Sequence, residues 1–429
     1  MSDPTINSYF PSKRVVVTGV GVVSPLGNTL EEFTEKLLAG TSAAQCIDIF
    51  DPAQLPTRIA AQSKVDIEEG RYINDRKVLF ALAASQAAIQ DAGIRESLPA
   101  QDYRLGLLSI GLGLELFSMP DMVSYIYEDG ASIDVAASRS LFHLQTPSDI
   151  CVHMINERHE LQLAPQIHVS ACSASSDAIG SAFRSIKQGQ CRWALAGGTD
   201  SMINPLGVAG FCKLNALTTR NENPTQASRP FDSKRDGFLL GEGAAFLVLE
   251  SLASAQARSA HIYAEICGYG NSFDAHGISE PHPSGAGAVL AMQAALREAE
   301  IAPSSISYIN AHGTSTPKND VVETLAIKRV FGDHAYRLKI SSTKSMIGHL
   351  ISAAGAVESA AMLACAQRRR IHPTINLNQT APECDLDYVG QGSESLPDGY
   401  WMKNSFGFGG QNASLVFAPA SGFSYENAK

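Results

Sequence analysis

The segment HVSACSASSDAIGSAFRSI, residues 168–186, decides the fold class because a short apolar strand runs directly into an amphipathic helix. The inward face of that helix carries Ala178, Ile179, Ala182, Phe183 and Ile186. Cys172 lies at the junction, where the helix dipole and unpaired backbone amides lower the pKa of a thiol from about 8.5. This position predicts that Cys172 is a nucleophile, and a small buried cysteine is the alternative.

On both sides of this segment, short β-branched runs alternate with alanine-rich amphipathic runs, which is typical of an α/β fold with buried strands. In the first half of the chain, strands are predicted at 14–23, 104–111, 165–171, 192–198 and 244–250, and helices at 30–39, capped by Thr29, and at 75–92. In the second half, strands are predicted at 263–269, 306–312 and 338–342, helices at 286–299, 321–331 and 349–368, and a closing hairpin between 384–389 and 412–417.

The two series have a similar order of elements, which indicates an internal duplication. The boundary is expected near 251–262, so we predict an N-terminal half at 1–255 and a C-terminal half at 256–429. Residues 112–150 fit the pattern least well and are expected to form an inserted cap or interface segment.

Composition excludes several classes of protein. The 429 residues are 45% hydrophobic and 18% charged, enough to bury a large core. No apolar run of membrane-spanning length and no signal peptide are seen, so we expect a cytoplasmic protein without membrane contact. The formal net charge of −10 disfavours nucleic-acid binding. The eight cysteines form no CxxC pair and no cluster with histidines, so neither a metal site nor a disulfide framework is predicted.

Three further motifs lie at predicted strand ends or strand-to-helix junctions. His312 follows a strand in NAHGTSTPKND (310–320), and Lys344 and His349 flank the start of an alanine-rich helix in SSTKSMIGHLISAAGAVESA (341–360). In GFGGQN (407–412), glycines allow backbone amides to approach a ligand closely. A structural histidine or a solvated lysine is the alternative for each residue taken singly. Because α/β folds bind ligands at such junctions, the motifs together predict one site.

Together these motifs resemble the β-ketoacyl-acyl carrier protein synthases, closest to their type II branch. The likeness extends from VVVTGVGVVSPLG to the C-terminus and includes SRPFDSKRDGFLLGEGA (228–244) and NSFGFGGQN (404–412). The resemblance implies the thiolase fold, with two related α/β halves in a five-layer αβαβα arrangement. It also implies a homodimer, or a heterodimer with a related subunit.

The resemblance implies an acyltransferase that performs decarboxylative Claisen condensation in fatty-acid or polyketide chain elongation. Cys172 would accept an acyl chain from the phosphopantetheine thioester of an acyl carrier protein. The carrier supplies this arm, so no bound cofactor is expected. A malonyl carrier would then lose carbon dioxide while His312 and His349 donate hydrogen bonds to the developing enolate.

The resemblance also gives roles to neighbouring residues. The backbone amides of Cys172 and Phe408 would hold the tetrahedral oxyanion, and Phe408 would gate the pocket. Lys344 would support the active-site network together with Glu323.

Substrate contacts are expected from Thr314 and Thr316, which match threonines that bind pantetheine, and from Phe238 beside the malonyl group. Plain core packing is the alternative for Phe238. Carrier proteins are typically acidic, so an acidic enzyme needs a local basic docking patch. The candidates for that patch are Arg71, Arg76, Lys77, Lys213 and Arg220.

Two positions depart from the family pattern: Asp177 stands where the fatty-acid enzymes often carry histidine, and Gln411 replaces a threonine. A different functional class is the inactive chain-length-determining partner subunit, but such subunits typically lack the nucleophile that Cys172 retains. Initiating synthases use one histidine with an asparagine, and thiolases use a second cysteine. A dinucleotide-binding oxidoreductase is disfavoured because GVGVVS (19–24) lacks the third glycine.

Overall fold

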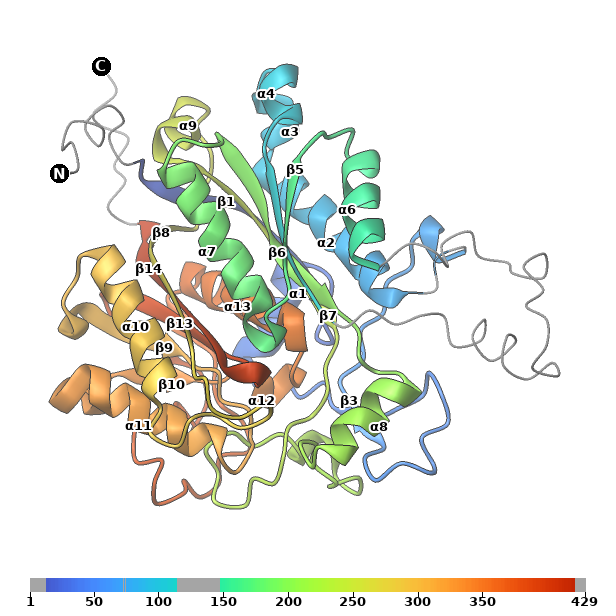
Figure 1. Cartoon of the computed structure of the whole chain (residues 1–429), viewed down its shortest axis with the longest axis vertical. Coiled ribbons are helices and arrows are strands. Elements are labelled where there is room, and N and C mark those ends of the chain that lie inside the picture. Colours follow the sequence, from blue (N-terminus) through green and yellow to red (C-terminus); the bar gives the residue numbers. More distant parts are fainter. Residues whose placement is uncertain (1–12, 72, 74, 114–146, 421–429) are drawn as a thin grey trace.

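The computed structural model describes residues 13–71, 73, 75–113 and 147–420, and a ten-stranded mixed sheet runs through it (Figure 1). The first half contributes β1 (Val15–Val23), β4 (Leu107–Leu112), β5 (Ala164–His168), β6 (Trp193–Asp200) and β7 (Gly243–Ser251). The second half contributes β8 (Ala264–Phe273), β9 (Ile306–Asn310), β10 (Lys339–Ser341), β13 (Tyr400–Phe406) and β14 (Gln411–Pro419). Two small ribbons pair β2 (Gln45–Cys46) with β3 (Ile59–Ala60) and β11 (Arg370–Ile371) with β12 (Glu394–Ser395).

The helices follow the same division. The first half holds α1 (Leu30–Leu38), α2 (Arg76–Ala92), α3 (Ile94–Ser97), α4 (Ala100–Arg104), α6 (Pro147–Arg158), α7 (Ala174–Lys187), α8 (Pro205–Lys213) and α9 (Leu252–Ala257). The second half holds α10 (Ala286–Ala299), α11 (Asn319–Phe331), α12 (Lys344–Ile347) and α13 (Ala354–Gln367).

Each half builds its part of the sheet in the same way. The strand order is β5-β4-β6-β7-β1 in one half and β10-β9-β13-β14-β8 in the other, which is third, second, fourth, fifth, first in both. In each half the first three of these strands are parallel and the last two run antiparallel to their neighbours. The antiparallel pair β1 and β8 joins the halves. The predicted duplication is therefore confirmed, and the exact split at 255/256, which falls in α9, stays a prediction.

The helices form three layers around the two half-sheets. α7 and α13 pack against each other and contact strands of both halves, so they form the middle layer (Figure 1). α2 and α6 cover the outer face of the first half, and α10 and α11 cover that of the second. The predicted five-layer arrangement is confirmed, with the largest apolar core around the middle layer.

Glycines on the two central strands let the outer helices approach closely. A Cβ built on Gly21 of β1 would lie 2.0 Å from the carbonyl oxygen of Ala84 in α2. A Cβ on Gly270 of β8 would lie 2.1 Å from the carbonyl oxygen of Ala291 in α10. The same close contact thus recurs in both halves.

Most of the predicted elements are present, and two predictions need correction. The closing hairpin pairs β13 with β14, and 384–389 contributes only an isolated bridge from Asp387 to Lys339. The segment 384–389 resembles a strand because buried residues alternate along it. β13 was not predicted because it contains the polar residues Lys403, Asn404 and Ser405. The helix predicted at 349–368 begins only at Ala354.

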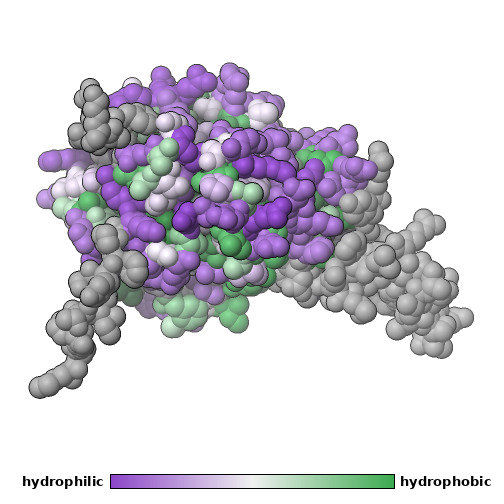
Figure 2. Space-filling view, turned by 90° about the horizontal axis from the view of Figure 1, so that it is seen from above, coloured by the Kyte–Doolittle hydropathy of each residue, from purple (hydrophilic) through white to green (hydrophobic). Residues whose placement is uncertain are grey.

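Most of the predicted insert at 112–150 lies outside the described residues. Within the part that is described, no helix combines the length and the apolar character needed to cross a bilayer. The face in Figure 2 is mainly hydrophilic, with hydrophobic residues in scattered patches.

Candidate active site

Cys172 lies on a sharp turn between β5 and α7. It occupies the 3-10 turn Ala171–Ser173, which continues into α7, and the preceding residue Ala171 has the left-handed φ of 47°. A non-glycine residue in this conformation is strained and must be held by its surroundings. The second half repeats the turn before α13, where Ile351 has a φ of 46° and Ser352 occupies the position equivalent to Cys172.

Asp177 holds this turn from the first part of α7. One carboxylate oxygen accepts a hydrogen bond from Ser173 Oγ at 3.0 Å and another from Ser170 Oγ. The other oxygen accepts from Tyr269 OH of β8 at 2.6 Å, so the turn is tied to the second half of the chain. Asp177 therefore supports the turn that carries Cys172.

The expected low pKa of the Cys172 thiol is wrong for the free enzyme. Burial raises the pKa to about 11, and hydrogen bonds from the backbone amides of Phe408 and Cys172, together with the charge of Lys344, only partly oppose this rise. Cys172 is only 1% exposed, so the desolvation of its thiolate outweighs the stabilisation of the thiolate by the start of the helix. The oxyanion role of these two amides stays a prediction.

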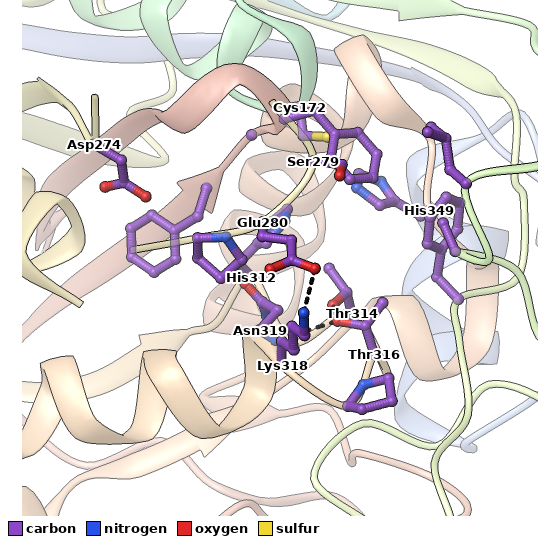
Figure 3. Close-up of a pocket in the computed structure, with 18 of the residues that line it drawn as sticks. Cys172, Asp274, Ser279, Glu280, His312, Thr314, Thr316, Lys318, Asn319 and His349 are labelled. Atoms are coloured by element: carbon purple, nitrogen blue, oxygen red, sulfur yellow. Dashed lines mark hydrogen bonds and ion pairs between the residues drawn. The ribbon is translucent and has the colours of Figure 1, made fainter. Parts of the chain in front are cut away.

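Cys172, His312 and His349 converge on one cavity of about 350 Å³ (Figure 3). The sulfur and one ring nitrogen of each histidine lie within 4.8 Å of one another. The two rings are 5.3 Å apart and nearly perpendicular, at 82°. Cys172 and His312 are 140 positions apart in the chain, and the fold brings them together. Each lies at the junction that was predicted from the sequence.

The hydrogen bonds of the two histidines fix their tautomers. The Ile351 amide donates to His349 Nδ1 at 3.1 Å, and the Lys344 ammonium lies 3.3 Å from His312 Nδ1. Both partners can only donate, so each neutral ring carries its proton on Nε2. Burial, followed by the positive charge of Lys344, lowers the pKa of both histidines well below 6.5 and keeps the rings neutral. A ligating histidine usually donates from its other nitrogen, so this pattern favours donation to a substrate oxygen over metal binding.

Lys344 and Glu323 both hydrogen-bond to the backbone of the loop that carries His312, each through different atoms. Glu323 accepts the backbone amides of His312 and Gly313, both at 2.8 Å, and so shapes the loop that carries His312. The ammonium of Lys344 pairs with Glu358 Oε1 at 2.5 Å and donates to the carbonyl oxygen of His312 at 2.7 Å.

Glu358 and Lys403 are buried charged residues that the sequence reasoning missed. Lys403 Nζ lies 2.8 Å from Glu358 Oε2, and both side chains are 0% exposed. A signal was present: Glu358 stands in the alanine-rich helix α13 and Lys403 in the buried strand β13. A charge inside an otherwise apolar element is costly unless it is paired.

The predicted substrate contacts and the predicted gate residue Phe408 also line the cavity. Thr314 and Thr316 hydrogen-bond to each other at 2.9 Å. The ring of Phe238 meets that of His349 edge-on at 5.2 Å, and the ring of Phe408 lies 6.5 Å from that of Phe238. These positions suit an entrance for a pantetheine arm and an aromatic gate, roles that stay predictions.

The loop around Asp274, which the sequence reasoning did not single out, borders the same cavity. Its carboxylate accepts from the Asn412 side chain at 2.9 Å and from the His282 amide at 2.9 Å. Glu280 of this loop forms an ion pair with Lys318 across the cavity lining (Figure 3).

The predicted docking patch at the start of α2 is wrong for Lys77. Lys77 is buried at 2% exposure, and the guanidinium of Arg76 is held by Glu242 at 2.5 Å. Lys77 cannot meet a partner without breaking internal packing, whereas the side chain of Arg76 is 27% exposed and its docking role stays a prediction. The side chain of Arg71 lies outside the described part of the structure.

The second docking candidate fits better. Lys213 is exposed at the end of α8, directly before Leu214, which lines the cavity and is 52% exposed. Arg220 lies farther along the same loop region, where it pairs with Asp236 at 3.2 Å.

Comparisons with known proteins agree with this geometry. Residues 12–255 match the family model "Beta-ketoacyl synthase, N-terminal domain" and residues 263–378 match "Beta-ketoacyl synthase, C-terminal domain". The chain is 41% identical over 413 residues to a 3-oxoacyl-[acyl-carrier-protein] synthase 2 of Synechocystis sp., covering 94% of this chain and 98% of that protein.

Two solved structures are similar over the same range. A beta-ketoacyl synthase from Burkholderia phymatum has 36% identity and a TM-score of 0.84, with 95% of this chain and 100% of that chain covered. A chain has also been solved in the complex of a type II polyketide acyl-carrier protein with its ketosynthase bound to the hexaketide. That chain has 31% identity and a TM-score of 0.85, with the same coverage. With its four motifs in one cavity and its two halves in the expected topology, this chain belongs to the beta-ketoacyl synthase family.

Proposed function

We propose that this chain is an elongating 3-oxoacyl-acyl carrier protein synthase that condenses malonyl carrier with an acyl group held on Cys172. Acyltransferase activity follows from the family, as the sequence predicts. The observation that carries the proposal is the approach of the Cys172 sulfur and one nitrogen of each histidine to within 4.8 Å.

The first step loads the acyl chain. The sulfur of Cys172 attacks the carbonyl carbon of the acyl thioester, a new C–S bond forms, and the pantetheine thiol leaves with the proton that Cys172 gives up. The oxyanion that forms on the carbonyl would accept hydrogen bonds from the amides of Cys172 and Phe408, which both lower the pKa of the thiol in the free enzyme.

The second step removes carbon dioxide from the malonyl thioester. The electrons of the broken C–C bond move toward the thioester oxygen, where the Nε2–H groups of His312 and His349 donate. Because both rings are already neutral and fixed by donors on Nδ1, they stabilise this charge as it develops without reorganising.

The third step forms the new carbon–carbon bond. The enolate carbon attacks the carbonyl carbon of acyl-Cys172, and the tetrahedral oxyanion again rests on the amides of Cys172 and Phe408. Its collapse expels the Cys172 thiolate and leaves a 3-oxoacyl chain on the carrier.

Substitution of either histidine tests this assignment. We expect His312→Ala and His349→Ala to lower carbon dioxide release from malonyl carrier by roughly 10²–10³-fold, the usual loss of one oxyanion donor. Acyl loading of Cys172, followed by mass spectrometry, is expected to continue, with His261→Ala, on an exposed histidine, as the control. Undiminished carbon dioxide release in both variants would exclude these roles.

An inactive chain-length-determining subunit is disfavoured by the same geometry. Such a subunit has no need for a thiol between two neutral imidazoles that point their donors into a cavity.

A panel of acyl-carrier primers of different length and saturation would define the preferred chain, and so the choice between fatty-acid and polyketide elongation.

We also propose that the enzyme works as a homodimer that receives an acidic carrier near Lys213. β5 is one end of the ten-stranded sheet, and Ile167 and the following Val169 are 40% and 72% exposed. At the other end, β10 is bridged by Asp387 and carries the charged Lys339. An exposed apolar edge strand invites pairing with a second chain, which favours β5 as the contact.

A further inference from the structure

The proposed mechanism gives no role to a buried row of charged side chains that lies behind His312. It runs from Lys403 to Glu358 to Lys344 and then to the carbonyl oxygen and Nδ1 of His312, with contacts of 2.8, 2.5, 2.7 and 3.3 Å in that order. All three charged side chains are at most 1% exposed. Isolated buried charges are unfavourable, so an arrangement with two ammonium groups on one carboxylate calls for an explanation.

Each ammonium holds a different oxygen of Glu358. Lys344 takes Oε1 and Lys403 takes Oε2, which fixes the plane of the carboxylate. Without Lys403, Glu358 would keep one partner but could rotate about it, or draw Lys344 away from His312. Lys403 is itself held by the Asn404 carbonyl oxygen and by Ser405 Oγ at 3.3 Å.

The same residue reaches toward the nucleophile. Ser405 Oγ, which accepts from Lys403, lies 2.8 Å from Ser176 Oγ in α7, the helix that follows Cys172. β13 continues into the glycine loop that contains Phe408. Lys403 therefore contacts Glu358, which pairs with Lys344, and Ser405, which contacts the helix after Cys172, and it does not line the cavity.

From this geometry we propose that Lys403 is a positioning residue for condensation: its ammonium holds Glu358 so that Lys344 stays on His312. The inference rests on the proposed function, because it concerns the same decarboxylation step. It assigns no chemical step to Lys403.

The titration of Lys403 makes this role measurable. Burial lowers its pKa to about 8, with Glu358 opposing the shift and Lys344 adding to it. The titratable groups that face Lys403 are Glu358 of α13, Lys344 of α12, Glu323 of α11, and His312 and His349 in the cavity. As pH rises through about 8, Lys403 loses its proton and Glu358 keeps only Lys344.

The test is the pH profile of carbon dioxide release from malonyl carrier, measured on the full chain. The unsubstituted enzyme is expected to lose activity on the alkaline side with a midpoint near pH 8. Arginine stays protonated at all these pH values, so Lys403→Arg keeps the charge. The alkaline limb of this variant is expected to move upward by roughly one pH unit or more. Lys403→Met is expected to release carbon dioxide roughly 10-fold more slowly at pH 7, less than the loss of a direct donor.

Two control measurements keep the outcomes distinct. Lys339→Met removes a lysine on the surface of β10 and is expected to leave the profile unchanged. Alkylation of Cys172 is expected to keep its pH dependence in Lys403→Arg, since Lys403 is not among the groups that shift this thiol. An unmoved alkaline limb in Lys403→Arg would overturn the inference, whereas absence of carbon dioxide release from the folded, unsubstituted enzyme would instead refute the proposed function.

Discussion

At the residue scale, the balance between burial and hydrogen bonding decides the resting state of the site. The start of a helix favours a thiolate, but Cys172 is buried so completely that desolvation dominates. The histidines experience the same burial, which here serves the chemistry because a neutral ring with a proton on Nε2 is the form that can donate. Burial thus disfavours the thiolate of Cys172 and also keeps the two histidines in the neutral form that can donate.

The raised thiol pKa gives a direct prediction for the free enzyme. With a pKa of about 11, the thiolate fraction at pH 7 is roughly one in ten thousand. Because the thiolate is the reactive form, alkylation of Cys172 by iodoacetamide is expected to rise about tenfold per pH unit up to pH 10. Mass spectrometry would follow the adduct, with Cys172→Ala as the control for other thiols. A rate that levels off below pH 8 would contradict this pKa.

At the scale of elements, the repeated contact between a glycine-bearing strand and an outer helix fixes the distance between layers. β1 meets α2 at Gly21 and β8 meets α10 at Gly270, and in both places a methyl group would overlap a backbone carbonyl. Because backbone cannot turn aside as a side chain can, the cost of a larger residue falls on the position of the helix.

Gly21→Ala is therefore expected to destabilise the protein by about 1–3 kcal/mol, the usual cost of overpacking a core. Urea unfolding would measure the change, with Gly270→Ala giving a similar loss. Gly210→Ala is the matched control, because a Cβ at this exposed position of α8 meets nothing within 4 Å. A wild-type midpoint for Gly21→Ala would show that α2 can move away without loss.

The element that sequence patterns misread shows why the site was only partly predictable. β13 lies between β9 and β14 in the sheet, yet no strand was predicted over its Lys403, Asn404 and Ser405. Those side chains are buried because Glu358 and other polar groups of neighbouring elements receive them. Periodicity detects apolar faces and cannot detect a polar network that is satisfied only after folding.

At the scale of the whole molecule, the two halves place their equivalent turns back to back. The Cys172 turn and the Ser352 turn precede the two helices of the middle layer, α7 and α13. Cys172 comes from one half and both histidines come from the other, so the cavity lies where the halves meet.

The homodimer proposed through β5 is tested at this scale. Val169→Lys places a charge on the exposed apolar edge, and it is expected to shift the molecule toward the monomer in analytical ultracentrifugation at micromolar concentration. Leu325→Lys, a change of the same chemistry at a residue that is 40% exposed on α11, is the control. A dimer that persists unchanged in Val169→Lys, or a monomeric parent protein, would exclude this contact.

By itself, the sequence determined the class of fold and the duplication, because strand and helix periods are local properties of the chain. Its motifs predicted Cys172, His312 and His349 as site residues, and the resemblance to a family implied their roles. The tertiary structure alone decided the thiol pKa, the tautomers of His312 and His349, and the pairing of Lys344 with Glu358. These properties depend on burial and on distances between residues far apart in the chain, and neither exists until the layers have packed.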